Sequence, residues 1–394
     1  MYPLVTNVIN KLYSATGSFS QSQNENPIVC ESSRKQTCMN DLPEELVIEI
    51  LLCLPVQSLL RFKVVCREWR SHISNPKFVK RHNVRTTTNP KHDYLIISYN
   101  YHYRSSDPDR LCVININPPH RAISLNLPTS ISHDNFDVVG SCNGLLCLDY
   151  KRSTERPYWR SPTKKLYLWN PATGKAKELP RCNISIMTEN YDVSLGFGFD
   201  FASSDYKVVR TAIRKKKKDS LENRVEVYSL KKNSWKNIEV DSEFDVGDCW
   251  RSSAFVMGSL YWISKKQGYS LLSFNLESEN FCIIPSLPAG ISCISDIFEF
   301  KESVAVRDFS TRKIINIWTL NDDSCWIKKL TINSAIIENK VGYLMTGEFV
   351  GLNCDNELVL YDPVNEVRRA IPQHRLHSSH VTTYSYSESL VNLN

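Results

Sequence analysis

The pattern of hydrophobic and polar residues divides the chain into a short helical region and a long β-rich region. From residue 41 to 82, apolar side chains recur at helical spacing: Leu46, Ile50 and Leu54 stand four residues apart and share one helical face. Pro55 ends that run and starts the next one, and a third apolar run ends at the following proline. This region is therefore predicted to form three short helices.

Beyond residue 90, short runs rich in Val, Ile, Tyr, Phe and Trp alternate with clusters of Asn, Asp, Ser, Gly and Pro, which is typical of β-hairpins. One hairpin unit recurs in degenerate form: an apolar strand, a polar turn and a second strand. Its copies follow one another at intervals of 43 to 59 residues, measured between the anchor positions Ile116, Trp169, Tyr228, Phe274, Trp318 and Tyr361.

A period of roughly 40–50 residues with several strands per unit is typical of a β-propeller, in which each blade covers the faces of its neighbours. Six hairpins predict six blades. The paired glycines of standard kelch repeats and the WD dipeptide are absent, so the predicted propeller is a degenerate, kelch-like one. A twisted β-sandwich built from repeated hairpins is the competing architecture.

The two ends of the chain differ in composition from the parts between them. Residues 1–40 are rich in Ser, Asn, Gln and Thr and are predicted to be a flexible leader. Residues 376–394 are predicted to be a polar tail. The expected domains are thus a helical module at 41–82 and a mainly β domain at 90–375.

Composition narrows the class of protein. The 394 residues are 42% hydrophobic and 23% charged, as in a globular protein, and the net charge of +6 gives only a mild preference for acidic partners, with no nucleic acid implied. The thirteen cysteines include no CxxC pair and are expected to be reduced thiols. No apolar run reaches the roughly 18 residues of a membrane span, and the N-terminus lacks a secretory pattern. We expect no membrane association and a cytoplasmic or nuclear location.

Two clusters of side chains could bind a partner or a metal, and each has a plainer interpretation. The basic run at 214–218 could contact an acidic partner or act as a nuclear address, but strand-like segments on both sides favour a solvated loop. His374, His377 and His380 could approach one metal ion on a helix. Their polar surroundings favour a solvated tail, so no metal site is predicted.

No catalytic signature stands out. Gly196 and Gly198 lack the third glycine and the following helix of a nucleotide-binding loop, and close packing within a sheet explains them better. The sequence also lacks GxSxG, HExxH, P-loop and CxxC motifs. We therefore predict neither a catalytic residue nor a cofactor.

The helical region resembles the F-box motif, which is a strong similarity because many positions match at the correct spacing. A Gln at position 57, where many plant relatives carry Lys, is a small departure. The matching positions are Leu42, Pro43, Glu45, Leu46, Ile50, Leu51, Leu54, Pro55, Leu59, Arg61, Phe62, Val65, Cys66, Trp69, Ile73 and Phe78.

The β-rich region resembles the F-box-associated domain that is common in plants. The segments that carry this similarity are GSCNGLLCL at 140–148, LWNPATGK at 168–175, LGFGFD at 195–200, DYKVV at 205–209 and GSLYW at 258–262.

These resemblances imply a non-catalytic receptor subunit of an SCF-type cullin-RING ubiquitin ligase. The F-box would bind a Skp-family adaptor, and through it a cullin and a RING subunit, while the β domain would hold a protein substrate for ubiquitination and proteasomal degradation. Residues that bind the substrate cannot be named from the sequence. The expected adaptor-binding residues are Leu42, Pro43, Leu46, Ile50, Leu54, Leu59 and Leu60, although any of them could instead belong to the internal core.

Two alternatives stay open at this point. The β domain could be a small-molecule-binding or enzymatic propeller whose F-box controls only turnover, and a polar pocket at the propeller axis would favour that function. The architecture is also similar to that of pollen S-locus F-box receptors, which recognise stylar ribonucleases. The net charge of +6 argues mildly against a basic target of that kind.

Overall fold

The computed structural model describes residues 43–89 and most of residues 94–393. The predicted flexible leader at 1–40 and the expected adaptor-binding residue Leu42 lie outside the described residues. The other positions outside the description are 41, 90–93, 100–110, 116–121, 130, 132–135, 151–164, 183–191, 216–220, 241–252, 265–269, 285–286, 288–289, 292, 312–313, 322–323, 334–341, 345, 354, 356, 376–380 and 394.

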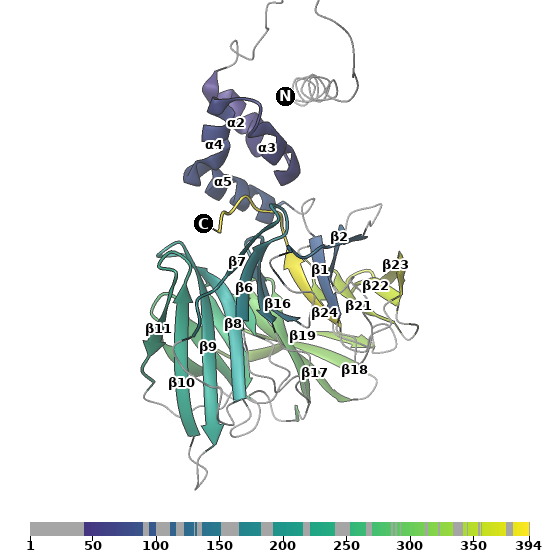
Figure 1. Ribbon diagram of the computed structural model, residues 1–394. Helices are drawn as coiled ribbons and strands as arrows, with labels where there is room; N and C mark the ends of the chain where they lie inside the picture. The colour runs from purple at the N-terminus through teal and green to yellow at the C-terminus, as the bar shows by residue number, and fades with distance from the viewer. Residues whose placement is uncertain are drawn as a thin grey trace, which may run out of the picture. The chain divides into compact units, whose positions relative to one another are not determined.

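The described N-terminal region contains four helices, α2 (Glu44–Leu52), α3 (Val56–Phe62), α4 (Arg67–Ser74) and α5 (Pro76–Thr87) (Figure 1). The chain divides into two compact units, Met1–His82 and Asn83–Asn394. The fourth helix adds to the three that the sequence predicts. Pro76 ends α4 and also begins α5, because proline fits the first turn of a helix and Asn75 Oδ1 accepts a hydrogen bond from Lys77 N at 2.9 Å.

The helical unit has a small internal core. Phe62 and Trp69 are buried and meet edge to face, with their ring centroids 5.2 Å apart. His82 is buried as well, and its Nε2 lies 2.9 Å from the carbonyl oxygen of Leu54. The buried apolar residues of this unit are Val47, Leu51, Leu52, Leu54, Val56, Leu59, Phe62, Trp69, Ile73 and Phe78.

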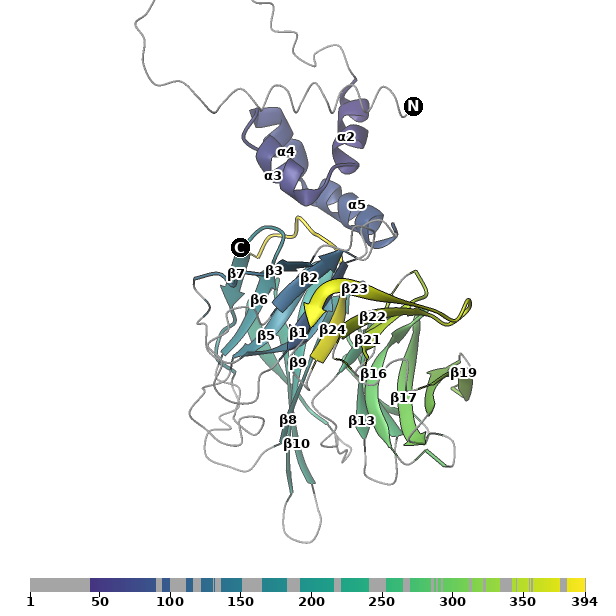
Figure 2. The same ribbon diagram turned by 90° about the vertical axis from the view of Figure 1, so that its right-hand side faces the viewer.

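The second unit is a β-propeller of six four-stranded antiparallel sheets (Figure 2). In each sheet the first-named strand below is innermost and contacts its counterparts in neighbouring sheets. The sheets are β24 (Val381–Tyr386), β1 (Tyr94–Tyr99), β2 (Leu111–Asn115) and β3 (Ala122–Ser124); β4 (Phe136–Cys142), β5 (Leu145–Tyr150), β6 (Lys165–Asn170) and β7 (Lys175–Glu178); β8 (Asp192–Asp200), β9 (Asp205–Lys215), β10 (Leu221–Ser229) and β11 (Ser234–Ile238); β12 (Ala254–Val256), β13 (Ser259–Ser264), β14 (Ser270–Asn275) and β15 (Phe281–Ile284); β16 (Ile294–Phe300), β17 (Ser303–Thr311), β18 (Ile314–Leu320) and β19 (Trp326–Asn333); and β20 (Gly342–Tyr343), β21 (Phe349–Leu352), β22 (Glu357–Asp362) and β23 (Val367–Arg375).

The predicted six-bladed propeller is confirmed, and the β-sandwich alternative is wrong. The repeated hairpin of the sequence is the third and fourth strand of each blade, so its period is the length of one blade. The anchors Trp169, Tyr228, Phe274 and Tyr361 are buried between blades, and Trp318 is partly buried. Because adjacent blades cover each other's faces, these third strands carry the strongest apolar signal.

The C-terminal region corrects the predicted polar tail at 376–394. Residues Val381–Tyr386 form β24, which pairs with β1 along its whole length and so closes the ring of blades. Its Thr and Tyr residues suit a strand, but its many polar side chains hide the apolar alternation on which a strand prediction depends.

The last residues are also ordered against the propeller. Leu390 and Leu393 are both 4% exposed. The side-chain amide of Asn170 donates hydrogen bonds to the carbonyl oxygens of Ser389 and Val391, both at 2.9 Å. Gly144 has a φ of +78° and lies so close that a Cβ there would be 2.3 Å from the Cβ of Ser389. The segment 387–393 thus packs against the second blade, where it contacts Gly144 and Asn170.

The propeller packs tightly enough to require glycine on an innermost strand. A Cβ on Gly198 would lie 2.3 Å from the ring of Phe255 on the next blade. Gly196, two residues earlier, would clash in the same way with Trp262 at 2.7 Å. Close approach therefore explains both glycines, as expected, with side chains of the neighbouring blade as the contacting groups.

The innermost strands β4, β8, β12 and β16 all run toward one end of the propeller, because each is followed by a short turn into its antiparallel neighbour. We call this end the turn face, defined by the turns at 143–144, 201–204, 257–258 and 301–302. The strand β24 also ends there, beside Gly144, and Tyr386 pairs with Tyr94 at the start of β1. The first strand of the propeller, β1, therefore starts at the turn face, and the last strand, β24, ends at the same face.

Candidate functional site

The helical unit leaves a set of apolar side chains in solvent. Leu46 on α2 is 51% exposed, and Val64 and Val65 in the turn after α3 are 76% and 55% exposed. Ile50 and Leu60 are partly exposed. A unit of this size cannot bury all of its apolar surface, and large apolar groups that remain in water are typical of a protein-binding face.

The structure separates the expected adaptor-binding residues into two groups. Pro43, Leu46, Ile50 and Leu60 are exposed or partly exposed and are therefore accessible to a partner. The other described members, Leu54 and Leu59, are 6% and 0% exposed and belong to the internal core, as the open alternative allowed. Leu54 does not share the helical face of Leu46 and Ile50 as expected, because α2 ends at Leu52 and Leu54 lies in the turn that follows.

Val64 and Val65 are exposed residues that were not among the expected adaptor-binding residues, although Val65 is one of the positions that match the F-box motif. The next helix, α4, begins only at Arg67, and the Cys66 Sγ caps it by accepting a hydrogen bond from Trp69 N at 3.4 Å. The two valines therefore stand in a turn outside any helical face. Two adjacent β-branched residues directly after a predicted helix were the available signal.

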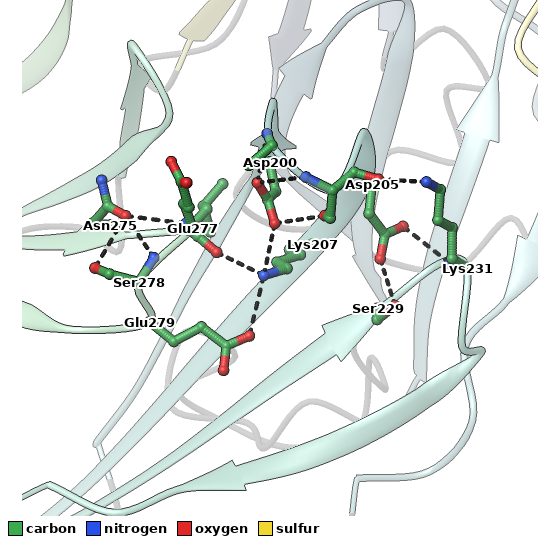
Figure 3. A network of polar contacts seen from close by, with 12 residues as sticks. Asp200, Asp205, Lys207, Ser229, Lys231, Asn275, Glu277, Ser278 and Glu279 are labelled. Carbon is green, nitrogen blue, oxygen red and sulfur yellow. Dashed lines mark hydrogen bonds and ion pairs between the residues drawn. The ribbon is translucent and has the colours of Figure 1, made fainter.

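A charged network centred on Lys207 joins two blades at the turn face (Figure 3). Lys207 lies on β9 and its side chain is 9% exposed; its Nζ is 3.0 Å from Asp200 Oδ2 and 3.1 Å from Glu279 Oε1, and it donates to the Leu276 carbonyl at 2.6 Å. Lys236 Nζ reaches the other oxygen of Glu279 at 2.8 Å. Because Glu279 belongs to the turn between β14 and β15, Lys207 fixes the third blade to the fourth.

Asp200 holds the turn at 201–204 in one conformation, and Asp205, which follows this turn, bonds to the neighbouring turn after β10. Asp200 Oδ1 accepts hydrogen bonds from two backbone N–H groups of the turn, at 3.0 and 3.2 Å. Asp205 Oδ1 accepts from the backbone N–H of Lys231 at 3.0 Å, and its other oxygen accepts from the Ser229 hydroxyl (Figure 3). Short polar side chains thus satisfy the backbone of an exposed turn.

The network shifts the pKa values of Asp200, Glu279 and Lys207. Burial alone raises the pKa of Asp200, but hydrogen bonds from Ser203 and Lys207 outweigh burial and lower it. Burial likewise opposes ionisation of Glu279, while Lys236 and Lys207 lower its pKa overall. For Lys207, burial lowers the pKa, and the two carboxylates raise it above its usual value. All three groups are therefore charged at neutral pH.

These shifts predict a pH-dependent effect of Lys207→Met. The folded-state pKa values of Asp200 and Glu279 are depressed, so their stabilisation is present above about pH 4 and is lost as the pH falls through those lower values. The raised pKa of Lys207 makes its stabilisation disappear only as the pH rises above about 10.5. We expect Lys207→Met to reduce the free energy of unfolding by about 2 kcal/mol at pH 7 and by much less near pH 3.

Urea denaturation followed by tryptophan fluorescence at both pH values measures this effect. Lys231→Met is the matched control, because Lys231 is an exposed lysine of the same turn region whose Nζ contacts only the Ser203 carbonyl in the network. Its effect is expected to stay below about 0.5 kcal/mol. Equal losses for the two variants, or a loss that is independent of pH, contradict the role given to Lys207.

Polar groups also approach one another near the propeller axis. The Tyr384 hydroxyl on β24 donates to the Val138 carbonyl on β4 at 2.7 Å. Burial and the charges of Asp137 and Asp296 raise the pKa of Tyr384, so this phenol stays protonated. The hydroxyl is thus committed to joining two innermost strands.

The described part of the chain contains no group of three or more His, Cys, Asp and Glu side chains placed to hold a metal ion. Within the same residues, no helix is both long and apolar enough to cross a membrane. The side chains of His374, His377 and His380 and the basic tip at 216–218 lie outside the described residues, and Arg214 next to that tip is paired with Glu222 at 2.6 Å.

Comparison with known families assigns both units. Residues 39–81 match the family model of the F-box domain, and residues 107–371 match that of the F-box associated beta propeller domain. These ranges correspond to the helical unit and to most of the six-bladed propeller. The second match alone covers well over half of the chain.

The names of curated relatives combine an F-box with kelch repeats. An F-box/kelch-repeat protein of Arabidopsis thaliana is 30% identical over 355 residues, which is 85% of this chain and 91% of the relative. An F-box/LRR-repeat/kelch-repeat protein of the same plant is 27% identical, covering 79% of this chain and 82% of the relative. A solved structure, the periplasmic gluconolactonase of Pseudomonas aeruginosa, covers 73% of this chain and 84% of that one at 11% identity with a TM-score of 0.42, too low for any conclusion. The chain belongs to the family of F-box proteins whose second part is an F-box associated β-propeller domain.

Proposed function

We propose that this protein is the substrate-recognition subunit of an SCF-type cullin-RING ubiquitin ligase. The observation that carries the proposal is the exposed apolar set of the helical unit, Pro43, Leu46, Ile50, Leu60, Val64 and Val65, on a domain that matches the F-box. A partner helix that covers these side chains removes them from water without disturbing the internal core. We assign this surface to a Skp-family adaptor, which connects to a cullin and a RING subunit.

In the proposed function, the propeller binds the target protein. Rigid turns on a closed scaffold are suited to present side chains to a partner. Ubiquitin transfer then depends on proximity: the target's lysines are held near an enzyme loaded by other subunits, so this chain needs no catalytic residue of its own. We place this activity in the cytoplasm or nucleus, with proteasomal degradation as the outcome for the target.

Substitution of Leu46 by Asp tests the adaptor-binding half. The change puts a charge in the centre of an apolar interface, and we expect the adaptor to bind about 30-fold more weakly, with an unchanged melting temperature because Leu46 is already 51% exposed. Binding of the purified adaptor is measured by calorimetry or surface plasmon resonance. Val84→Asp is the matched control, since Val84 is a helical apolar residue of similar exposure (55%) outside the proposed surface. Normal adaptor binding by Leu46→Asp, or no binding by the unaltered chain, overturns the proposal.

A further inference from the structure

Two large apolar side chains stand in solvent on adjacent turns of the turn face. Phe201, in the turn between β8 and β9, is 61% exposed, and Met257, in the turn between β12 and β13, is 68% exposed. A Cβ built on Gly258, the residue after Met257, would lie 3.5 Å from the Phe201 ring. The two turns are therefore neighbours across the third and fourth blades, and both present an apolar side chain to solvent.

Two further aromatic rings continue this surface into the core. Phe199 meets Phe201 edge to face at 5.4 Å, and Phe255 stacks with Phe201 at 6.4 Å. Phe199 and Phe255 are only partly buried. We call Phe199, Phe201, Phe255 and Met257 the turn-face patch. Single exposed apolar residues are common on protein surfaces, but a cluster of three phenylalanines and a methionine is not explained by chance exposure.

The turn-face patch is built rigidly, which is unusual for exposed apolar side chains. Asp200 fixes the turn that carries Phe201, and Lys207 fixes Asp200 to the fourth blade (Figure 3). Met257 and Gly258 form the two-residue turn between β12 and β13 and have φ values of +46° and +81°, as the tight hairpin requires. The turn conformation thus holds the Met257 side chain in solvent, where it adds apolar surface that the fold itself does not bury.

Beside the patch, the aspartates are buried and the lysines of the turn next to Phe201 are exposed. The carboxylates of Asp200 and Asp205 are in buried residues and are engaged by hydrogen bonds. By contrast, Lys231 and Lys232 on the turn next to Phe201 are exposed, and the Lys231 side chain touches the Phe201 turn at the Ser203 carbonyl. Farther out, Lys236 is paired with Glu279 at 2.8 Å, and the exposed carboxylates Glu239 and Glu277 lie on the outer part of the third blade and on the fourth blade. The exposed charges on the turn next to Phe201 are therefore the two lysines Lys231 and Lys232.

We propose that the turn-face patch binds the target protein, and that the bound segment is a peptide with a large apolar side chain next to Asp or Glu residues. This inference rests on the proposed receptor function and names the chemistry of the target. Phe201 and Met257 would contact the apolar side chain, and Lys231 and Lys232 would attract the acidic ones. A second copy of this chain fits less well, because a symmetric contact would bring the same lysines together across the interface.

A phage-displayed library of random peptides is the test, selected on the full chain bound to its Skp-family adaptor. The expected enrichment is of peptides that combine Leu, Phe, Trp or Met with neighbouring acidic residues. An enriched peptide is then synthesised with a fluorophore, and its Kd is measured by polarisation. We expect Phe201→Ser/Met257→Ser to weaken binding about 100-fold and Lys231→Glu/Lys232→Glu at least about tenfold. Val364→Ser is the matched control, since Val364 is 85% exposed on a turn of the sixth blade, and it is expected to bind normally.

Several outcomes overturn the inference: no enrichment, enrichment of basic or purely polar peptides, or peptides that bind Phe201→Ser/Met257→Ser as well as the unaltered chain. Concentration-dependent dimerisation that is lost in the same variant also overturns it, because the patch then binds a second copy. Adaptor binding is measured on each variant in parallel. Normal adaptor binding with failed peptide selection rejects only the turn-face patch, whereas loss of adaptor binding by the unaltered chain rejects the proposed function itself.

Discussion

Removal of residues 381–394 is expected to abolish the stable propeller fold. The deletion removes β24, the innermost strand of the first sheet and the pairing partner of β1. Without it, β1 becomes an open apolar edge, and the innermost strands β4 and β20 lose the neighbour they contact on that side. The lost stabilisation is of the order of the whole net stability of a typical domain, about 5–15 kcal/mol. Circular dichroism and thermal unfolding should show no cooperative transition.

A shorter truncation separates the closing strand from the segment that follows it. Removal of residues 387–394 keeps β24 but exposes the sites of Leu390 and Leu393 and leaves Asn170 without its two carbonyl acceptors. We expect this chain to fold with a loss of about 4 kcal/mol. Deletion of residues 1–40, the predicted leader, is the control and should leave the melting temperature unchanged. A cooperative, unshifted transition after removal of 381–394 would show that the ring closes without β24.

The architecture was predictable because the blade repeat has a strong local signal. Each third strand carries a large residue such as Trp169, Tyr228 or Phe274 that is buried between blades, and a polar turn follows it at a constant offset. The closing strand has no such signal. It pairs with β1, far away in the sequence, and its residues 381–386 include three Ser or Thr positions that look like loop. A partner so distant along the chain leaves no trace in local periodicity.

The candidate sites were only partly predictable, for a related reason. The period of four correctly places Leu46 and Ile50 on one helical face, but it cannot say which apolar positions pack inward, and Leu59 is fully buried. On the propeller, the segment LGFGFD attracts attention through its glycines, whereas the solvent-exposed residue is the Phe201 that follows. Its proximity to Met257 depends on two blades meeting, which only the tertiary structure brings about.

Buried charge is the other feature that the sequence conceals. Lys207 joins the third and fourth blades, and a second ion pair lies inside the third sheet, where Arg210 on β9 faces Glu226 on β10 with Nη1 and Oε2 2.9 Å apart. Their side chains are 4% and 0% exposed. Neither residue looks unusual in the sequence, because both stand in strands with ordinary alternation. Their energetic weight comes from the absence of water around them.

Substitution of Glu226 by Ala is expected to reduce the free energy of unfolding by about 3–5 kcal/mol, because it removes a carboxylate that compensates the buried charge of Arg210. The matched control is Glu178→Ala on the neighbouring blade. Lys165 and Glu178 also form an ion pair between adjacent strands, with Nζ and Oε2 2.9 Å apart, but both side chains are 46% exposed, so the expected loss is at most about 1 kcal/mol. Urea denaturation at pH 7 measures both variants.

A third variant decides whether charge or volume causes the loss at this site. Arg210→Met/Glu226→Leu removes both charges and keeps apolar volume, and we expect it to recover most of the stability lost in Glu226→Ala, since a well-packed apolar pair replaces a buried ion pair at little net cost. If the double variant is as unstable as the single one, the loss arises from packing or from the other neighbours of Arg210. If Glu226→Ala and Glu178→Ala lose the same small amount, burial does not strengthen the pair, and distance alone sets its value.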